Sequence, residues 1–190
     1  MVSRLAVLVG FILLCSCQDQ IQPKQNAFLA LNYPEANYKL LQSNCNFEFE
    51  MNQNARISKG KYLDSCSFNI TYPELNATIF FTYKPVNNNL KALLIDAQKL
   101  PLKHTIKADA IEADVYTNRL ANTYGNFYQV EGDAASQAQF YLTDSLKHFV
   151  TGSIYFETTP NYDSILPAAA YMKRDLKHMV ETMRWRSNTP

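Results

Sequence analysis

The chain has 190 residues, and its 18 basic and 17 acidic side chains leave it close to neutral. Nucleic acids and anionic membrane surfaces attract proteins that carry a strongly basic surface, so this balance argues against either as the main partner. The length suits one domain with a sizeable core, and only 5 glycines beside 12 tyrosines and 11 phenylalanines favour β-strands.

The N-terminal segment, residues 1–16, has the features of a cleavable signal peptide. Arg4 precedes a short apolar run that is not long enough for a comfortable permanent membrane span. The motif Leu14-Cys15-Ser16-Cys17 resembles a bacterial lipobox, in which a small residue precedes the cysteine that receives the lipid. Ser16 is that small residue, whereas the first cysteine of the motif follows a bulky leucine. We therefore expect cleavage after residue 16 and a lipid on Cys17.

An ordinary secretory signal is the alternative, in which Cys17 would be a spare thiol. Such signals are usually cut after an A-x-A-like site, and this region has none. Loss of Arg4 would leave 17 basic and 17 acidic residues, and no later stretch is long and apolar enough for a second span. Residues 17–26 are predicted to be a lipidated polar tether, and residues 27–190 a single α+β domain. Only one acid, Asp19, lies near the anchor, which favours a domain that faces the periplasm.

Two further cysteines, Cys45 and Cys66, lie in the predicted domain. In an oxidising envelope compartment a disulfide is the default expectation, and it would stabilise the fold by roughly 3 kcal/mol. A redox or metal pair is the alternative, but the spacing is far from C-x-x-C. The cysteines begin two alternating segments, 45–51 and 66–72, which predict strands. A simple hairpin would separate the starts of these strands, so a further reversal is needed, for which 55–58 could be a return strand.

The middle of the chain predicts a strand, a helix and four more strands. Residues 77–83 alternate as a strand, and apolar residues at helical spacing follow the asparagines 87–89, which offer a helix cap. Pro101 should kink or end this helix, although residues 102–108 could resume it. Short turns between the later strands indicate an antiparallel sheet. These strands are expected at 111–115, 124–131, 134–142 and 148–156.

The last element is the strongest predicted helix. Asp163 or Ser164 is the expected cap, and Pro167 is expected in the first turn, where proline is tolerated. An apolar stripe typical of core packing follows, made of Ile165, Ala169, Met172, Leu176, Met179, Val180 and Met183. Trp185 is expected to fix the end of the helix. The order of strands, helix, strands and helix predicts an α+β fold with one antiparallel β-sheet covered by helices, similar in pattern to the PsbP-like α/β/α sandwich.

Motifs for catalysis or cofactor binding are missing from the sequence. It contains no H-E-x-x-H or G-x-S-x-G pattern, no phosphate-binding glycine loop and no dinucleotide fingerprint. The three histidines, His104, His148 and His178, are widely separated and lack the spacing of metal ligands. We therefore expect no catalytic residue, no metal and no cofactor. The aromatic strands could present one sheet face to a partner or an apolar ligand, although burial is the commoner explanation.

The best polar cluster lies where the first predicted helix meets the next strand. It consists of Lys103, His104, Lys107 and Asp109. His104 with Asp109 could be an acid–base pair or a ligand-binding corner. The alternative is a solvated helix end whose cations satisfy the terminal carbonyls, and no nucleophile lies nearby in sequence. We interpret the cluster as a candidate interaction surface.

Several short segments along the chain form a combined pattern. They are Cys45-Asn-Phe-Glu-Phe49, Cys66-Ser-Phe-Asn-Ile-Thr-Tyr-Pro73, Ala77-Thr-Ile79, Tyr83-Lys-Pro85, His104-Thr-Ile-Lys-Ala-Asp-Ala-Ile111, Ala134-Ala-Ser136, Gln139-Phe-Tyr-Leu-Thr-Asp-Ser145, His148-Phe149 and Met183-Arg-Trp185. Together these segments resemble the gliding motility lipoprotein GldD family of Bacteroidota over nearly all of the mature chain. Pro101 departs from the unbroken helix that the resemblance implies at this position.

Members of that family are envelope lipoproteins needed for gliding motility and for the linked type IX secretion system. The resemblance implies a non-enzymatic accessory lipoprotein, anchored to a membrane by its lipid, that contacts protein components of this machinery. No catalytic residues carry over, whereas the lipidated and disulfide cysteines correspond to Cys17, Cys45 and Cys66. The alternative is a periplasmic ligand-binding or enzymatic lipoprotein with a pocket near His104 and Asp109.

Overall fold

The computed structural model of the chain describes residues 33–58, 66–102, 107–157 and 162–186. Predictions about the signal peptide, the tether and the lipidation of Cys17 fall outside these residues and stay predictions. The same is true of Lys103 and His104. Within the described ranges, no helix is both long and apolar enough to cross a membrane.

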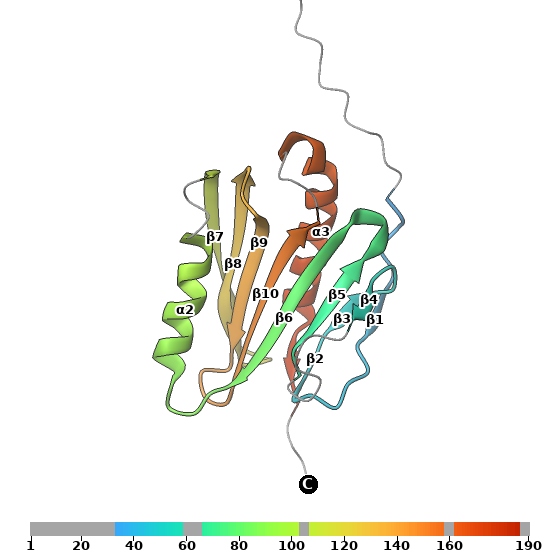
Figure 1. Cartoon of the computed structure of the whole chain (residues 1–190). Helices are drawn as coiled ribbons and strands as arrows, with labels where there is room; N and C mark the ends of the chain where they lie inside the picture. Colours follow the sequence, from blue (N-terminus) through green and yellow to red (C-terminus); the bar gives the residue numbers. More distant parts are fainter. Residues whose placement is uncertain (1–32, 59–65, 103–106, 158–161, 187–190) are drawn as a thin grey trace, which may run out of the picture.

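One antiparallel sheet of seven strands forms the centre of the molecule (Figure 1). Its strands and the helix that interrupts them are β4 (Arg56–Ser58), β5 (Phe68–Tyr72), β6 (Ala77–Pro85), α2 (Leu90–Leu102), β7 (Ala108–Asn118), β8 (Thr123–Gly132), β9 (Ser136–Thr143) and β10 (His148–Phe156), with a short 3-10 turn at Pro73–Leu75. Across the sheet the order is β4-β5-β6-β10-β9-β8-β7. Helix α2 carries the chain from β6 to the far edge at β7, and the meander from β7 to β10 returns to pair with β6. The strand predicted before the first helix and the four predicted after it are confirmed.

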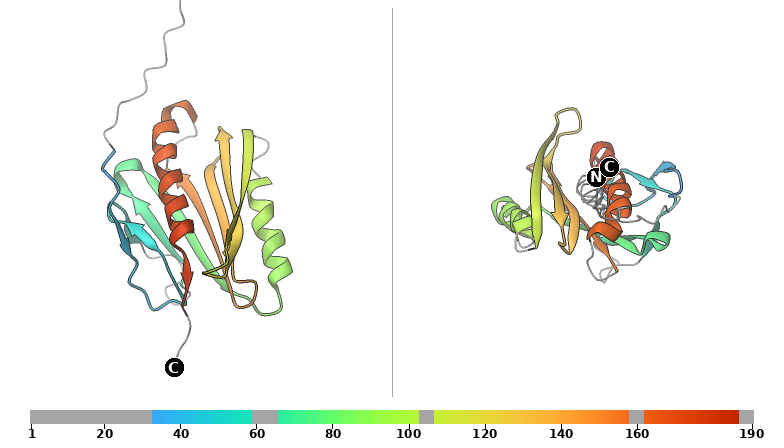
Figure 2. Two further views of the ribbon diagram at one scale, coloured as in Figure 1. Left: turned by 180° about the vertical axis from the view of Figure 1, so that it is seen from behind. Right: turned by 90° about the horizontal axis from the view of Figure 1, so that it is seen from above.

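Helix α3 (Tyr162–Thr182) lies on the face of the sheet opposite to α2, as the view from above in Figure 2 shows. The main core lies on the α3 side, where Met172, Leu176 and Met179 pack among sheet residues. A smaller cluster lies on the α2 side and contains Leu93, Ala97, Tyr128, Tyr141 and Phe149. Successive residues of a strand point to opposite faces, so the same strands supply both clusters. The α+β fold is therefore confirmed, whereas the likeness to the PsbP-like sandwich stays a prediction.

Four short strands form two further ribbons beside α3. They are β1 (Tyr38–Leu40), β2 (Phe47–Glu48), β3 (Glu50–Asn52) and β11 (Arg184–Trp185). β1 pairs with β3, and β2 pairs with β11, which follows α3. The prediction of one strand over 45–51 is therefore wrong, because the two halves of this segment pair with different partners and separate at Phe49. The alternation was read correctly, since Phe47 and Phe49 are both fully buried.

Cys45 and Cys66 form the expected disulfide, with 5.7 Å between their Cα atoms. Cys66 has a φ of +57°, in the left-handed region, and it stands just before β5. The bond therefore links the start of β5 to the segment that enters β2. The return strand predicted over 55–58 is confirmed as β4, which pairs with β5 in antiparallel fashion.

The end of α2 agrees with the prediction only in part. The helix passes through Pro101 and ends one residue later, at Leu102. A proline lacks the N–H that the helix ladder needs, so termination close to it is the expected result. The helix does not extend to residue 108, because Lys107 lies in a turn and Ala108 already begins β7.

The start of α3 differs from the prediction. The helix begins at Tyr162, so Asp163 and Ser164 lie in its first turn and not before it. Pro167 lies inside the helix, beyond the first turn where it was expected. The carboxylate of Asp163 still stabilises the start of α3, since negative charge near a helix N-terminus is favourable.

Strand β9 is buried along its whole length, including two glutamines. The Gln137 amide donates from Nε2 to the carbonyl oxygens of Ala134 and Gly132, at 2.8 and 3.2 Å. Within the described part of the chain, Gln139 has no hydrogen-bond partner at either amide atom, and the Oε1 of Gln137 also lacks one. An unpaired amide in a core is destabilising, so Gln139 is a point of local frustration in the sheet.

Candidate functional site

The predicted polar cluster at 103–109 is described only at Lys107 and Asp109. Both side chains are exposed. The register between β7 and β8 shifts between Ala108 and Ala110, which makes Asp109 the extra residue of a bulge. Gly132 faces it with a φ of +97°, and a Cβ on this glycine would lie 2.7 Å from the Asp109 backbone nitrogen. The bulge therefore fixes the backbone position of Asp109. The pairing of Asp109 with His104 stays a prediction.

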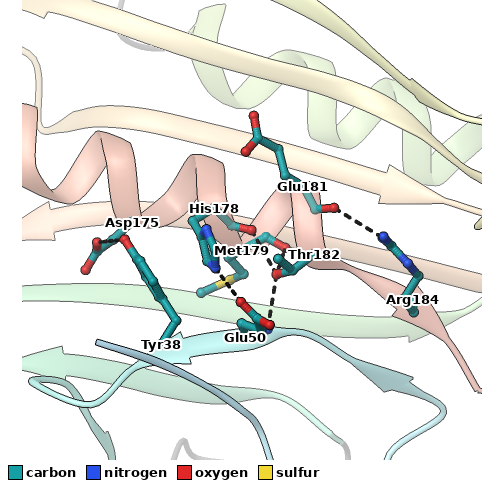
Figure 3. Close-up of polar contacts among 8 residues, drawn as sticks. All are labelled: Tyr38, Glu50, Asp175, His178, Met179, Glu181, Thr182 and Arg184. Carbon is teal, nitrogen blue, oxygen red and sulfur yellow. Dashed lines mark hydrogen bonds and ion pairs between the residues drawn. The ribbon is translucent and has the colours of Figure 1, made fainter. Parts of the chain in front are cut away.

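A buried polar cluster, not anticipated from the sequence, lies between α3 and the ribbon of β1 and β3. Its centre is Asp175 on α3, which is only 4% exposed. One carboxylate oxygen accepts a hydrogen bond from the Tyr38 hydroxyl at 2.6 Å (Figure 3), and the other accepts one from Asn52 Nδ2 at 2.7 Å. Asn52 also donates to the Tyr171 hydroxyl at 2.8 Å. Burial and then the Asp175 carboxylate raise the pKa of Tyr38 and of Tyr72, so both phenols stay protonated as donors.

One turn further along α3, a second group of contacts continues the cluster (Figure 3). The His178 ring stacks on Tyr38, with 3.7 Å between the ring centroids, and its Nε2 lies 2.7 Å from Glu50 Oε2. Thr182 Oγ1 accepts a hydrogen bond from the Glu50 backbone N–H at 3.1 Å and donates to the His178 carbonyl. Positions 175, 178 and 182 share one helix face, because residues three and four apart are neighbours there. We call this set, Tyr38, Glu50, Asn52, Asp175, His178 and Thr182, the α3 latch.

The α3 latch does not have the arrangement of a catalytic site. The His178 ring contacts Glu50, and the Thr182 hydroxyl contacts a backbone carbonyl, so no histidine ring activates a hydroxyl as in a triad. Both oxygens of Asp175 accept hydrogen bonds from the fold. Over the described ranges, no group of three His, Cys, Asp or Glu side chains is arranged to hold a metal. The latch therefore fixes the first described strand, β1, onto α3.

A hollow of about 630 Å³ lies at the end of the sheet where β11 meets the turns that follow β7 and β9. His148 lies in it, with its ring stacked on Trp185 at 5.2 Å and its Nδ1 2.9 Å from the Tyr83 hydroxyl. Burial lowers the pKa of His148, and Lys147 acts in the same direction, although Asp144 opposes them. Trp185 donates from Nε1 to the Asn122 carbonyl at 3.1 Å. This contact joins the residues after α3 to the sheet, which agrees with the role expected of Trp185.

A second hollow, of about 510 Å³, lies on the outer face of β6 and β10. In Figure 1 no helix covers this part of the sheet on the α2 side. The lining residues are Thr78, Phe80, Thr82, Thr151, Ser153, Tyr155 and Glu157. Phe80 and Tyr155 meet edge to face, with 5.4 Å between their ring centroids. Neither this hollow nor the first is lined by Lys107 or Asp109.

The family model for the gliding motility lipoprotein GldD matches residues 18–185 of the chain. The chain belongs to the GldD family. The match includes α2, α3, the seven-stranded sheet and the α3 latch, so the resemblance carried by the short segments is confirmed. Membership of the GldD family implies a part in gliding motility and a lipid-anchored place in the cell envelope. A comparison with curated proteins gave no match.

Proposed function

We propose that this GldD-family chain is a non-enzymatic lipoprotein of the gliding and type IX secretion machinery, which works through protein contacts in the periplasm. The family match over residues 18–185 is the observation that carries this proposal. In the proposed mature protein residues 1–16 have been removed, Cys17 carries the lipid, residues 17–26 are the tether and residues 27–190 form the domain. The membrane is therefore one partner, through the lipid, and protein components of the machinery are the other.

The contacts of the polar side chains support a role without catalysis. Asp175 and His178 are the most conspicuous buried or half-buried ionisable groups on α3, and the fold itself supplies their partners. A catalytic acid or base must come within hydrogen-bond reach of a substrate, whereas both Asp175 oxygens and His178 Nε2 are hydrogen-bonded to groups of the fold. The α3 latch instead joins the core helix to β1, the described strand nearest in sequence to the proposed anchor. A mechanical force on the proposed tether would therefore be transmitted through β1 and the α3 latch to the core helix.

The test is a clean deletion in the native bacterium, complemented with the wild-type chain or with Cys17→Ala. Colony spreading and the secreted type IX substrates are scored in the same strains. We expect the deletion to abolish both, and only the wild-type chain to restore them. Normal spreading and secretion in the deletion strain would contradict the proposal.

The lipid assignment has a matched control within the same motif. Cys15→Ala removes the neighbouring cysteine but leaves Ser16 before Cys17, so lipidation and membrane extraction should be unchanged. Cys17→Ala should lose the mass of the lipid and leave the membrane fraction. If the Cys17→Ala chain were still lipidated, or if Cys15→Ala lost its lipid, the anchor would be elsewhere than proposed.

The outer-face hollow favours one second candidate, an envelope lipoprotein that binds a small ligand. Its size falls in the usual range for ligand pockets, and it combines the aromatic pair Phe80 and Tyr155 with several hydroxyl groups. The candidate predicts a small molecule that copurifies with the wild-type chain and is lost from Phe80→Ala. Mass spectrometry of the two purified proteins decides it, and an identical absence of bound molecules in both would count against a ligand.

A further inference from the structure

Two exposed leucines lie at one end of the sheet. Leu120 is 101% exposed and Leu146 is 75% exposed. They stand on different turns, 119–122 after β7 and 144–147 after β9, yet both line the hollow of about 630 Å³ that also contains Trp185. We call this end, with its two turns and β11, the turn surface. It lies at the lower end of Figure 1, while the first described residues enter the domain from the upper end.

Hydrogen bonds fix the backbone beneath both leucines. Asp144 Oδ1 accepts from the backbone N–H groups of Leu146, Lys147 and His148, at 2.9, 2.8 and 2.8 Å. On the other turn, Asn118 Oδ1 accepts from the Ala121 N–H at 3.1 Å. The Trp185 indole holds the same turn through its hydrogen bond to the carbonyl oxygen of Asn122. The leucines are therefore presented on ordered turns, which lowers the entropic cost of binding through them.

The charges around the turn surface are mainly positive. Arg119, Lys147 and Arg184 are exposed at this end. Arg184 Nη1 donates to the carbonyl oxygens of Met183 and Glu181, at 2.7 and 3.1 Å, and this places its guanidinium.

Among the residues that the structure describes, Asp144, Glu48 and Glu181 carry carboxylates in the same region. Asp144 is engaged by its turn, and Glu48 pairs with Arg186 at 3.0 Å. Glu181 is exposed, in the last turn of α3. The exposed side chains at this end are therefore two leucines with three basic residues and one acidic residue around them. We call Arg119, Lys147 and Arg184 the basic rim.

We infer that the turn surface binds a protein segment that carries apolar side chains beside carboxylates. This deepens the proposed function, on which it rests, by naming the surface used for the protein contacts. Leu120 and Leu146 would contact apolar side chains of the partner at the edge of the hollow, while Arg119 and Arg184 would face its carboxylates. Complementary charge of this kind steers association and fixes register, and a few exposed anchors can carry most of the affinity.

The test uses the full-length chain in the native bacterium with a photoreactive residue. Leu120→benzoylphenylalanine and Leu146→benzoylphenylalanine probe the surface, and Val115→benzoylphenylalanine is the control. Val115 is 78% exposed but stands on β7, outside the turn surface. We expect positions 120 and 146 to crosslink to the same protein, in a segment where Asp or Glu stands beside apolar residues. Position 115 should give no such product.

A charge reversal then tests the basic rim. In the Leu146→benzoylphenylalanine chain, Arg119→Glu with Arg184→Glu should reduce the crosslink at least about tenfold. Lys39→Glu with Arg56→Glu changes the net charge equally at two exposed positions elsewhere and should leave the yield unchanged. An equal loss from both pairs would contradict a specific role for the rim.

Four outcomes would overturn the inference. They are crosslinks to a second copy of this chain, adducts of phospholipid, crosslinks to a segment without carboxylates, and no product from positions 120 and 146 at normal protein level. The deletion phenotype is scored separately. Loss of spreading without the crosslinks would refute the turn surface alone, and crosslinks without a deletion phenotype would refute the role in gliding alone.

Discussion

Among single residues, Gln139 shows most clearly what the sequence could not predict. The alternation in the predicted strand 134–142 puts Ala138, Phe140 and Leu142 on one face and Gln139 on the opposite face. The pattern did not reveal that both faces of β9 are buried, because the covering residues come from α2 and α3, which are distant in sequence. His148 is similar, since it was read simply as a strand residue. Its contacts with Tyr83 and Trp185 arise only in the folded chain.

The two buried glutamines of β9 should respond in opposite ways to the same substitution. Gln139→Met keeps the volume and removes an amide without partners, so the free energy of unfolding should rise by roughly 1 kcal/mol. Gln137→Met removes two hydrogen bonds to carbonyl oxygens and should lower it by about 1 to 2 kcal/mol. Urea unfolding of both variants measures the difference. A loss of stability in Gln139→Met would show that its amide is hydrogen-bonded in solution.

The lowered pKa of His148 makes stability depend on pH. The unfolded chain, in which a histidine has a pKa of about 6.5, binds this proton more readily than the folded chain does. The contribution is therefore complete above about pH 6.5 and is lost as the pH falls through that value toward the folded pKa. Unfolding measured from about pH 7.5 to about pH 5.5 should give a flatter curve for His148→Gln than for the wild type. Identical slopes would mean that His148 titrates normally in the folded protein.

At the scale of whole elements, the sequence predicted a strand or helix best where the element packs against one partner along its whole length. Strands β5 and β6 alternate clearly in the sequence, and the apolar stripe of α3 faces a single core, so these elements could be predicted. The segment 45–51 was misread because its halves pair with β11 and β1, which only α3 brings together. The α3 latch was missed for a related reason. Its partners Tyr38 and Glu50 are 137 and 128 residues away from Asp175 and His178.

The α3 latch should be a major contribution to the attachment of β1. Asp175→Ala would leave the Tyr38 hydroxyl and an Asn52 donor without their acceptor, and we expect a loss of about 3 kcal/mol in the free energy of unfolding. Lys177→Ala, an exposed position on the same helix, is the control and should change it by less than about 0.5 kcal/mol. Thermal or urea unfolding compares the two. Equal stability of both variants would remove the latch from this account.

At the scale of the whole molecule, the attachment of β1 to α3 and the turn surface lie toward opposite ends of the domain. The first described residues enter the domain at one end and attach to α3, and the turn surface lies at the other (Figure 1). Family and fold class could both be predicted from the sequence, since short motifs and alternation are local signals. The turn surface could not, because Leu120 and Leu146 stand on separate turns and share a hollow only after the meander has folded. The predicted candidate surface at 103–109 is described only in part, with Lys107 and Asp109 exposed.

The most direct measurement of the central claim is colony spreading by the deletion strain that carries Leu120→Glu with Leu146→Glu. Both side chains are exposed, so the double variant should fold and be lipidated as the wild type is. If the protein acts through contacts at the turn surface, this strain should fail to spread, while the Val115→Glu control spreads normally. Full spreading by the double variant at wild-type protein level would contradict the account.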